Sequence, residues 1–236
     1  APGATPAEVA VALRAKRSVS TSRPGPEVMR ALFERLAAEG AEAVVAVHIS
    51  RELSGTWESA HLAARDASIP GVCVDSGHAG GATGLAALAA VETIAAGGDA
   101  QAAAQAAQAK AAASNSYFYV DTLEYLRRGG RIGGAAAFFG SALAVKPLLG
   151  IQAGKVVPLE KVRTSARALA RLEELLVAAA GDAPADVVIS HLANPERAAE
   201  LAARLTERLQ DNLEGRPVSC IEIGGETVGM AEQTAG

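Results

Sequence analysis

Two short runs of continuous apolar residues constrain this chain more than any other feature. They are "AEAVVAVHIS" at 41–50 and "GVCVDS" at 71–76, and segments with helical spacing precede, separate and follow them. A run that is apolar throughout, rather than at alternate positions, is typical of a strand buried on both faces of a parallel sheet. Strands of this kind that alternate with helices predict a doubly wound α/β layer. The first part of the chain is therefore expected to form a largely parallel sheet with helices on both faces.

The second half of the sequence has a different pattern. Strand-like runs at 144–152 and 155–162 are separated by Ala153-Gly154, which indicates a hairpin. Further strand-like segments at 116–121, 185–192 and 217–224 alternate with helical segments at 165–180 and 194–209. A hairpin among strand–helix units predicts a mixed or antiparallel sheet covered by helices. The predicted organisation is two α/β domains, residues 1–115 and residues 116–236.

Composition excludes several classes of protein. The chain is 50% hydrophobic but 3% aromatic, so its core is aliphatic, and its net charge of -4 argues against nucleic-acid binding. It contains no apolar run of membrane-spanning length and no basic-then-apolar leader, so we expect a cytoplasmic protein without stable membrane insertion. Cys73 and Cys220 sit in strand-like runs and form no CxxC pair, which predicts buried, reduced thiols. The sequence begins at Ala1 without Met, so we expect a piece at the front to be missing.

Several familiar catalytic motifs fail when their spacing is checked. "GIQAGKV" is one residue short of a phosphate loop, and no Ser or Thr follows Lys155. Neither G-x-S-x-G nor the G-x-G-x-x-G order is present. The four histidines show no metal-ligand spacing and are expected to be core or surface residues: His48, His61, His78 and His191. The sequence therefore predicts no catalytic residue, metal site or cofactor.

Three loops combine hydroxyl side chains with glycines: "STSRPG" at 20–25, "SRELSGT" at 50–56 and "DSGHAGGATG" at 75–84. Ligands of open α/β sheets bind in such loops, at the carboxyl ends of the strands. Ser54 is predicted to be the N-cap of the helix that follows. The free N–H groups of a helix N-terminus, with Ser and Thr hydroxyls beside them, would form an anion site. The alternative interpretation is that Ser54 only caps its helix.

A local basic cluster, "RRGGR", interrupts this acidic chain at 127–131. One interpretation is a solvated helix end, where cations are favourable. The other is contact with an anion or with an acidic partner. Arg131 follows two glycines, which let the backbone approach a ligand closely, whereas Arg127 and Arg128 end a short helix and are expected to face outward.

Taken together, these motifs resemble the successive signatures of the DegV family, in the family's order. They are "TSRP", "ISRELSGTWESA", "VDS", "DTLEYLRRGGRI", "VKPLLGI" and "GKVVPLEKVRT", and they run from about Ser20 to Arg163. This family includes the fatty-acid-binding subunits of bacterial fatty acid kinase. The resemblance implies two α/β domains with a long acyl chain held between them and no catalysis by the chain itself.

The resemblance also implies roles for individual residues. Hydroxyls of the TS-x-P and SGT loops hold the carboxylate, with Arg131 near the same end; the loop residues are Thr21, Ser22, Ser54, Gly55 and Thr56. The carrier, expected to be a monomer, presents this carboxylate to a separate ATP-dependent kinase, which makes an acyl phosphate. Arg127 and Arg128 are then available to that partner.

The sequence departs from the family pattern at both ends. Family members begin with a strand and a "DS" motif before the TS-x-P loop, and this front strand is absent here. They also carry an H-x-G-P-G-like motif near the C-terminus, where this chain has "GETVGMAEQTAG" without a histidine. Two alternatives stay open at this point: a sensor or carrier of another lipid or small anion, and a stand-alone phosphotransferase or hydrolase.

Overall fold

The structure is a computed structural model of the 236-residue chain and describes residues 5–15, 17, 19, 21–138 and 145–223. The contacts within it divide the chain into two compact units. The parallel-sheet unit consists of residues 22–114 and 153–155, and the mixed-sheet unit consists of residues 1–21, 115–152 and 156–236. That residues 1–115 and 116–236 are the folding domains stays a prediction.

The parallel-sheet unit alternates helices and strands as expected. Its elements are α2 (Pro26–Ala38), β1 (Val44–His48), α3 (Thr56–Arg65), β2 (Gly71–Asp75), α4 (Gly81–Ala95) and α5 (Ala100–Ala112). The strands β1 and β2 are parallel neighbours, with Val44 opposite Gly71 and His48 opposite Asp75. The carboxyl ends of both strands therefore lie side by side, and each leads into a loop that precedes a helix.

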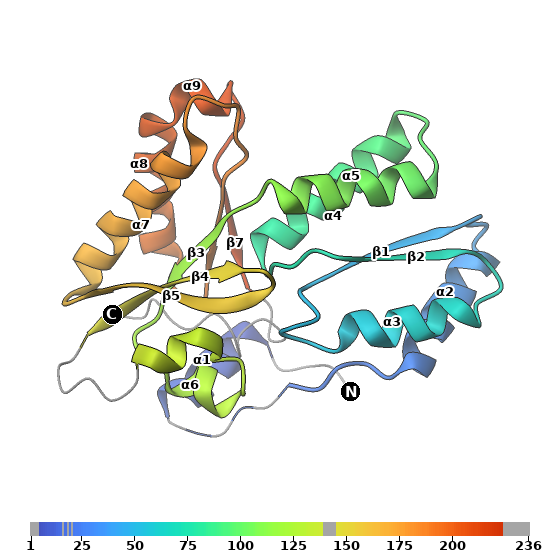
Figure 1. Cartoon of the computed structure of the whole chain (residues 1–236), viewed down its shortest axis with the longest axis horizontal. Helices are drawn as coiled ribbons and strands as arrows, with labels where there is room; N and C mark the ends of the chain where they lie inside the picture. Colours follow the sequence, from blue (N-terminus) through green and yellow to red (C-terminus); the bar gives the residue numbers. More distant parts are fainter. Residues whose placement is uncertain (1–4, 16, 18, 20, 139–144, 224–236) are drawn as a thin grey trace. The chain divides into compact units, whose positions relative to one another are not determined.

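Both faces of the β1–β2 sheet are covered by helices (Figure 1). One face packs against the alanine-rich surfaces of α4 and α5 and presents Val45, Val47, Val72 and Val74. The other face presents Val44, Ala46 and Cys73, which pack with Phe33 of α2 and Ala60 and Ala63 of α3. Alternate residues of each strand thus enter separate cores, which explains why the strands are apolar throughout and confirms the predicted parallel, doubly covered sheet.

The mixed-sheet unit contains the remaining elements. They are α1 (Pro6–Arg14), β3 (Ser116–Tyr119), α6 (Glu124–Arg128), the 3-10 helix η1 (Gly133–Phe138), β4 (Lys146–Gln152), β5 (Lys155–Val162), α7 (Ser165–Ala180), β6 (Val188–His191), α8 (Pro195–Arg208), α9 (Gln210–Leu213) and β7 (Ser219–Glu222). The first residue of β5, Lys155, groups with the parallel-sheet unit.

The described strands of the mixed-sheet unit form two sheets. One has the order β3-β4-β5, with β3 and β4 antiparallel, and the other pairs β6 with β7 in parallel. The predicted hairpin is confirmed, because Ala153 and Gly154 link β4 to β5 with positive φ angles of 48° and 78°. Two such residues in succession are typical of a type I′ turn. Mixed strand directions are thus also confirmed, although they belong to separate sheets.

One expectation about the thiols was wrong. Cys73 is half-buried in β2, but Cys220 is exposed, and both are free. Among the described residues, β7 has a strand neighbour on one side, β6, and all four of its residues are exposed. Apolar residues in a short edge strand do not require the burial that a central strand imposes. Among the described residues, no helix is both long and apolar enough to cross a membrane.

Candidate functional site

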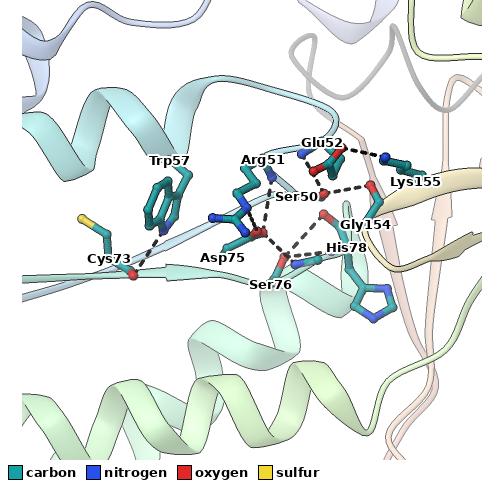
Figure 2. Close-up of polar contacts among 11 residues, drawn as sticks. Ser50, Arg51, Glu52, Trp57, Cys73, Asp75, Ser76, His78, Gly154 and Lys155 are labelled. Atoms are coloured by element: carbon teal, nitrogen blue, oxygen red, sulfur yellow. Dashed lines mark hydrogen bonds and ion pairs between the residues drawn. The ribbon is translucent and has the colours of Figure 1, made fainter. Parts of the chain in front are cut away.

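The loop after β1 is held in place by Ser50, which is fully buried. The N–H of Ser50 donates to the carbonyl of His78 at 2.7 Å, and its own carbonyl accepts from the N–H of Ser54 at 3.0 Å. Its hydroxyl donates to the carbonyl of Gly154 at 2.8 Å and accepts from the N–H of Glu52 at 3.1 Å (Figure 2). Ser50 therefore links three segments of the parallel-sheet unit and fixes the position from which the SGT residues begin.

The SGT residues form the entrance to α3. The hydroxyl oxygens of Ser54 and Thr56 are 2.7 Å apart and share a hydrogen bond, and the N–H of Thr56 donates to the Ser54 hydroxyl at 3.3 Å. Among the described residues, the N–H groups of Trp57 and Glu58 in the first turn have no hydrogen-bond partner. Free N–H groups and two adjacent hydroxyls thus meet at one helix N-terminus.

The predicted N-cap is displaced by one residue. The cap of α3 is Gly55, which has φ -76° and ψ 17°, and it offers no side-chain hydrogen bond. Ser54 precedes it and bonds to the first helical N–H, not to the second or third as a capping side chain would. The helix starts one residue later than predicted because Ser54 is still part of the turn closed by its bond to Ser50.

Arg23 of the TSRP segment lies directly against Gly55. A Cβ atom added to Gly55 would stand 2.8 Å from the Arg23 Cδ and 3.0 Å from its Cζ, with Nη1 closer still. Nη1 also donates to the carbonyl of Gly55 at 3.5 Å. Within the parallel-sheet unit, the TSRP and SGT segments are therefore neighbours, although 32 positions separate these two residues in the sequence.

The polar groups at the end of β2 and in the loop after it bond to one another and to the loop after β1. One oxygen of Asp75 accepts from the N–H groups of Arg51 at 3.3 Å and Gly77 at 2.9 Å, and the Arg51 guanidinium pairs with the other oxygen at 3.5 Å. The hydroxyls of Ser76 and Thr83 bond to each other at 2.9 Å. The contacts between Arg51 and Asp75 therefore join this region to the loop after β1, as Figure 2 shows.

Two histidines lie near these loops. Burial lowers the pKa of His78, against the opposing effect of a hydrogen bond with the Ala111 backbone. Burial also lowers the pKa of His48, against the opposing charge of Asp75, and the buried Nε2 of His48 has no partner among the described residues. Both rings are therefore favoured in their neutral form at neutral pH. The described residues contain no cluster of three or more His, Cys, Asp or Glu that could hold a metal ion.

The basic cluster lies in the mixed-sheet unit. Glu124 binds both helical arginines: its carboxylate accepts from Arg127 at 2.7 and 2.9 Å and from Arg128 at 2.7 Å. These hydrogen bonds, first from Arg127 and then from Arg128, lower the pKa of Glu124 to about 2. Arg127 and Arg128 are exposed, whereas Arg131 is half-buried after Gly130, which has φ 73°, and Arg131 donates to the Gly129 carbonyl.

The structure brings together only some of the predicted ligand residues within one unit. Ser54, Gly55 and Thr56 form one loop of the parallel-sheet unit, and Ser22 belongs to the same unit. Thr21 and Arg131 belong to the mixed-sheet unit. The common contribution of all six residues to one site stays a prediction. Sequence reasoning missed Ser50 and Arg23, whose roles depend on contacts with distant residues.

A comparison with known protein families shows the family to which the chain belongs. The family described as "Uncharacterised protein, DegV family" matches residues 3–231. The chain belongs to the DegV family. A DegV domain-containing protein of Streptomyces coelicolor is 53% identical over 201 residues, which cover 85% of this chain and 72% of that protein. The resemblance seen in the sequence motifs is thereby confirmed.

Solved structures of DegV proteins share the fold. The Bacillus subtilis DegV structure, described as that of a fatty acid binding protein, has a TM-score of 0.80 and 30% identity, covering 94% of this chain and 78% of that one. A Thermus thermophilus DegV family protein, whose structure is described in terms of fatty acid binding, also has a TM-score of 0.80 and 30% identity, with 96% and 80% covered. The α/β fold of the family therefore extends to this chain.

Proposed function

We propose that this chain binds a long-chain fatty acid without catalysing a reaction, and that the Ser54–Thr56 loop holds the carboxylate. The observation that carries the proposal is the pair of hydroxyls at the N-terminus of α3. A hydrogen bond between Ser54 and Thr56 uses one of their two hydroxyl protons, so the other remains available to an acceptor. With the N–H groups of Trp57 and Glu58, this loop offers neutral donors in a place that favours an anion.

The fatty acid binding described for the Bacillus subtilis and Thermus thermophilus relatives supports the choice of ligand. The physical chemistry agrees with it. Burial of an acyl chain stabilises the complex by about 0.8 kcal/mol per CH2 group. The protein is 50% hydrophobic and 3% aromatic, so it can supply the aliphatic surface for this burial. Thr21, Ser22 and Arg131 complete the proposed carboxylate site. The placement of the acyl chain between two domains is part of the same proposal.

The proposal extends to a partner. A separate ATP-dependent fatty acid kinase would receive the carboxylate and form the acyl phosphate, as the family resemblance implies. The exposed guanidinium groups of Arg127 and Arg128 support a role in docking, because a cationic rim steers an acidic partner. We propose that the carrier works in the cytoplasm, as a monomer, where such a kinase has access to it.

Extraction identifies the ligand. Organic extracts of the purified, folded protein should contain a long-chain fatty acid at roughly one molecule per chain, and added fatty acid should raise the melting temperature, because a ligand of the folded state stabilises it. Recovery of a different lipid or of a small anion would favour the alternative sensor or carrier function. Extracts without acyl lipid, together with a melting temperature that fatty acid leaves unchanged, would refute fatty-acid binding.

The substitution Ser54→Ala tests the position of the carboxylate. Loss of a hydrogen bond to a charged group costs about 1.5–3 kcal/mol, so binding of the acid should weaken while binding of its methyl ester changes little. The fold should survive, since loss of a helix-end hydrogen bond costs about 1 kcal/mol. Isothermal titration with acid and ester measures both affinities. The control is Ser190→Ala, at an exposed serine of β6, and an equal loss for acid and ester in Ser54→Ala would place the carboxylate elsewhere.

A further inference from the structure

The guanidinium of Arg23 occupies the space that a side chain at position 55 would need. Its Cδ and Cζ lie 2.8 and 3.0 Å from the point where a Cβ of residue 55 would stand. The backbone does not require glycine there, because Gly55 has φ -76°, a value that any residue adopts. The absence of a side chain at Gly55 is thus explained by the close approach of Arg23.

Among the described residues, no acidic side chain balances the charge of Arg23, which is exposed. Two other cations of the same unit have acidic partners: Arg51 pairs with Asp75, and Lys155 pairs with Glu52 at 3.2 Å. Arg23 stands beside Gly55, the cap of α3, where the helix dipole disfavours a cation. An anion bound at the Ser54–Thr56 loop would attract both the Arg23 cation and the positive end of the helix dipole, and so would offset their mutual repulsion.

We propose that Arg23 is a specificity-determining residue of this site, which favours an ionised carboxylate over neutral lipids with the same acyl chain. This inference rests on the proposed function. A guanidinium presents donors in a planar fork that matches the two oxygens of a carboxylate. Gly55 serves this role because, without a side chain, it leaves room for the guanidinium between Ser54 and Thr56 in the sequence.

A double-mutant cycle tests the role of Arg23. An ion pair between exposed groups contributes up to about 1 kcal/mol to binding. Arg23→Gln should therefore weaken binding of the acid by up to about fivefold at low salt. The loss should shrink at high salt because the charge is screened, and the methyl ester should bind as before. Arg23→Lys should retain part of the preference, since it keeps the charge without the fork.

Gly55→Ala supplies the second arm of the cycle. The added methyl group should displace the flexible end of Arg23 without unfolding the protein. It should weaken binding of the acid to the same degree as Arg23→Gln does. Once Arg23 is Gln, the further change Gly55→Ala should have little additional effect, because the guanidinium that the methyl group would displace is already absent. The charge-matched control is Arg30→Gln on the exposed surface of α2, which should leave the affinity for the acid unchanged.

Each outcome has a definite meaning. The role of Arg23 would be overturned if Arg23→Gln lost affinity for acid and ester equally, or if its effect and that of Gly55→Ala were additive. It would also be overturned if Arg30→Gln lost as much affinity for the acid. Unmodified protein that binds neither acid nor ester would instead refute the proposed function itself. The two failures are therefore distinguishable in the same titrations.

Discussion

At the residue scale, Gly154 is the most constrained position in the turn between β4 and β5. Its φ angle of 78° is one that residues with a side chain rarely adopt. A Cβ at this position would also stand 2.5 Å from the Ser50 hydroxyl oxygen and 3.2 Å from the Cγ of Glu52. Glycine is required here both by the turn and by the buried hydrogen bond that holds the loop carrying the SGT residues.

We therefore expect Gly154→Ala to destabilise the protein more than backbone strain alone explains. Strain at a positive φ costs about 1–2 kcal/mol, and the contact with Ser50 should add about 1–3 kcal/mol. The control is Gly97→Ala in the same unit, where φ is 88° and no atom lies within 4 Å of the added Cβ. Urea unfolding of both variants measures the difference, and equal losses would show that the contact with Ser50 is unimportant.

At the scale of elements, a buried carboxylate joins α7 to α8. Glu173 of α7 is 8% exposed and accepts hydrogen bonds from Arg204 at 2.9 Å and from Arg208 at 2.8 Å. The two arginines stand one turn apart on α8, so both reach the same carboxylate. Burial raises the pKa of Glu173, but the hydrogen bonds from Arg208 and Arg204 together outweigh it, and the pKa is lowered from its ordinary value of 4.5.

The prediction at this scale is a loss of stability in Glu173→Gln that depends on pH. Because the folded-state pKa is lowered, the charged group stabilises the fold above its ordinary pKa and loses this effect as the pH falls through the folded-state value. At pH 7 the variant should be about 1–3 kcal/mol less stable, and the difference should shrink in acid. Thermal unfolding at several pH values measures it.

The control for this prediction is Glu174→Gln. Glu174 is exposed and pairs with Arg171 at 2.7 Å on the surface of the same helix. Exposed pairs contribute about 0–1 kcal/mol, so this variant should remain close to the original protein. If Glu173→Gln and Glu174→Gln lose the same stability, the link between α7 and α8 contributes no more than a surface pair.

At the scale of the whole molecule, charge is distributed unevenly. The chain carries 22 Lys and Arg against 26 Asp and Glu, yet α6 ends in two adjacent arginines and Arg131 follows shortly after. Glu124 pairs with Arg127 and Arg128 together, so one carboxylate faces two cations. The cluster therefore keeps a positive charge in an acidic protein, which is the condition for steering an acidic partner.

We expect the double reversal of Arg127 and Arg128 to Glu to leave the proposed fatty-acid affinity nearly unchanged and to slow association with the proposed kinase partner, most clearly at low salt. Rim charges act chiefly on association rate and its salt dependence. Stopped-flow association with the kinase subunit measures the rate. The control is the double reversal of Arg30 and Arg35 on α2, which changes the net charge by the same amount. An equal slowing in both variants would indicate a general effect of charge, not docking at α6.

Much of the fold could be predicted from local pattern. The continuous apolar runs identified β1 and β2 because their alternate residues enter two cores, and Ala153-Gly154 identified the hairpin because a type I′ turn favours glycine. The separation of β6 and β7 from the β3-β4-β5 sheet could not be predicted, since it depends on which strands meet across long distances. The exposure of Cys220 follows from the same pairing.

The candidate site was predictable to a smaller extent. The SGT residues stood out because hydroxyls and glycine precede a helix, but the exact cap depended on the bond between Ser54 and Ser50. The contact of Arg23 with Gly55 and the bond from Ser50 to Gly154 join residues far apart in sequence. No local pattern contains them, and so the sequence indicated the chemistry of the loop without the residues that position it.

The bond from Ser50 to Gly154 also has a consequence for the order in which the protein matures. Its two ends are 104 positions apart, and a ribosome adds about 5–20 residues per second. The Gly154 carbonyl that accepts from the Ser50 hydroxyl is therefore synthesised about 5–20 s after Ser50. By the end of that interval, residues 22–114 have all been made, but their loop still lacks its final hydrogen bond. A nascent chain cannot complete this loop until the hairpin tip has been translated.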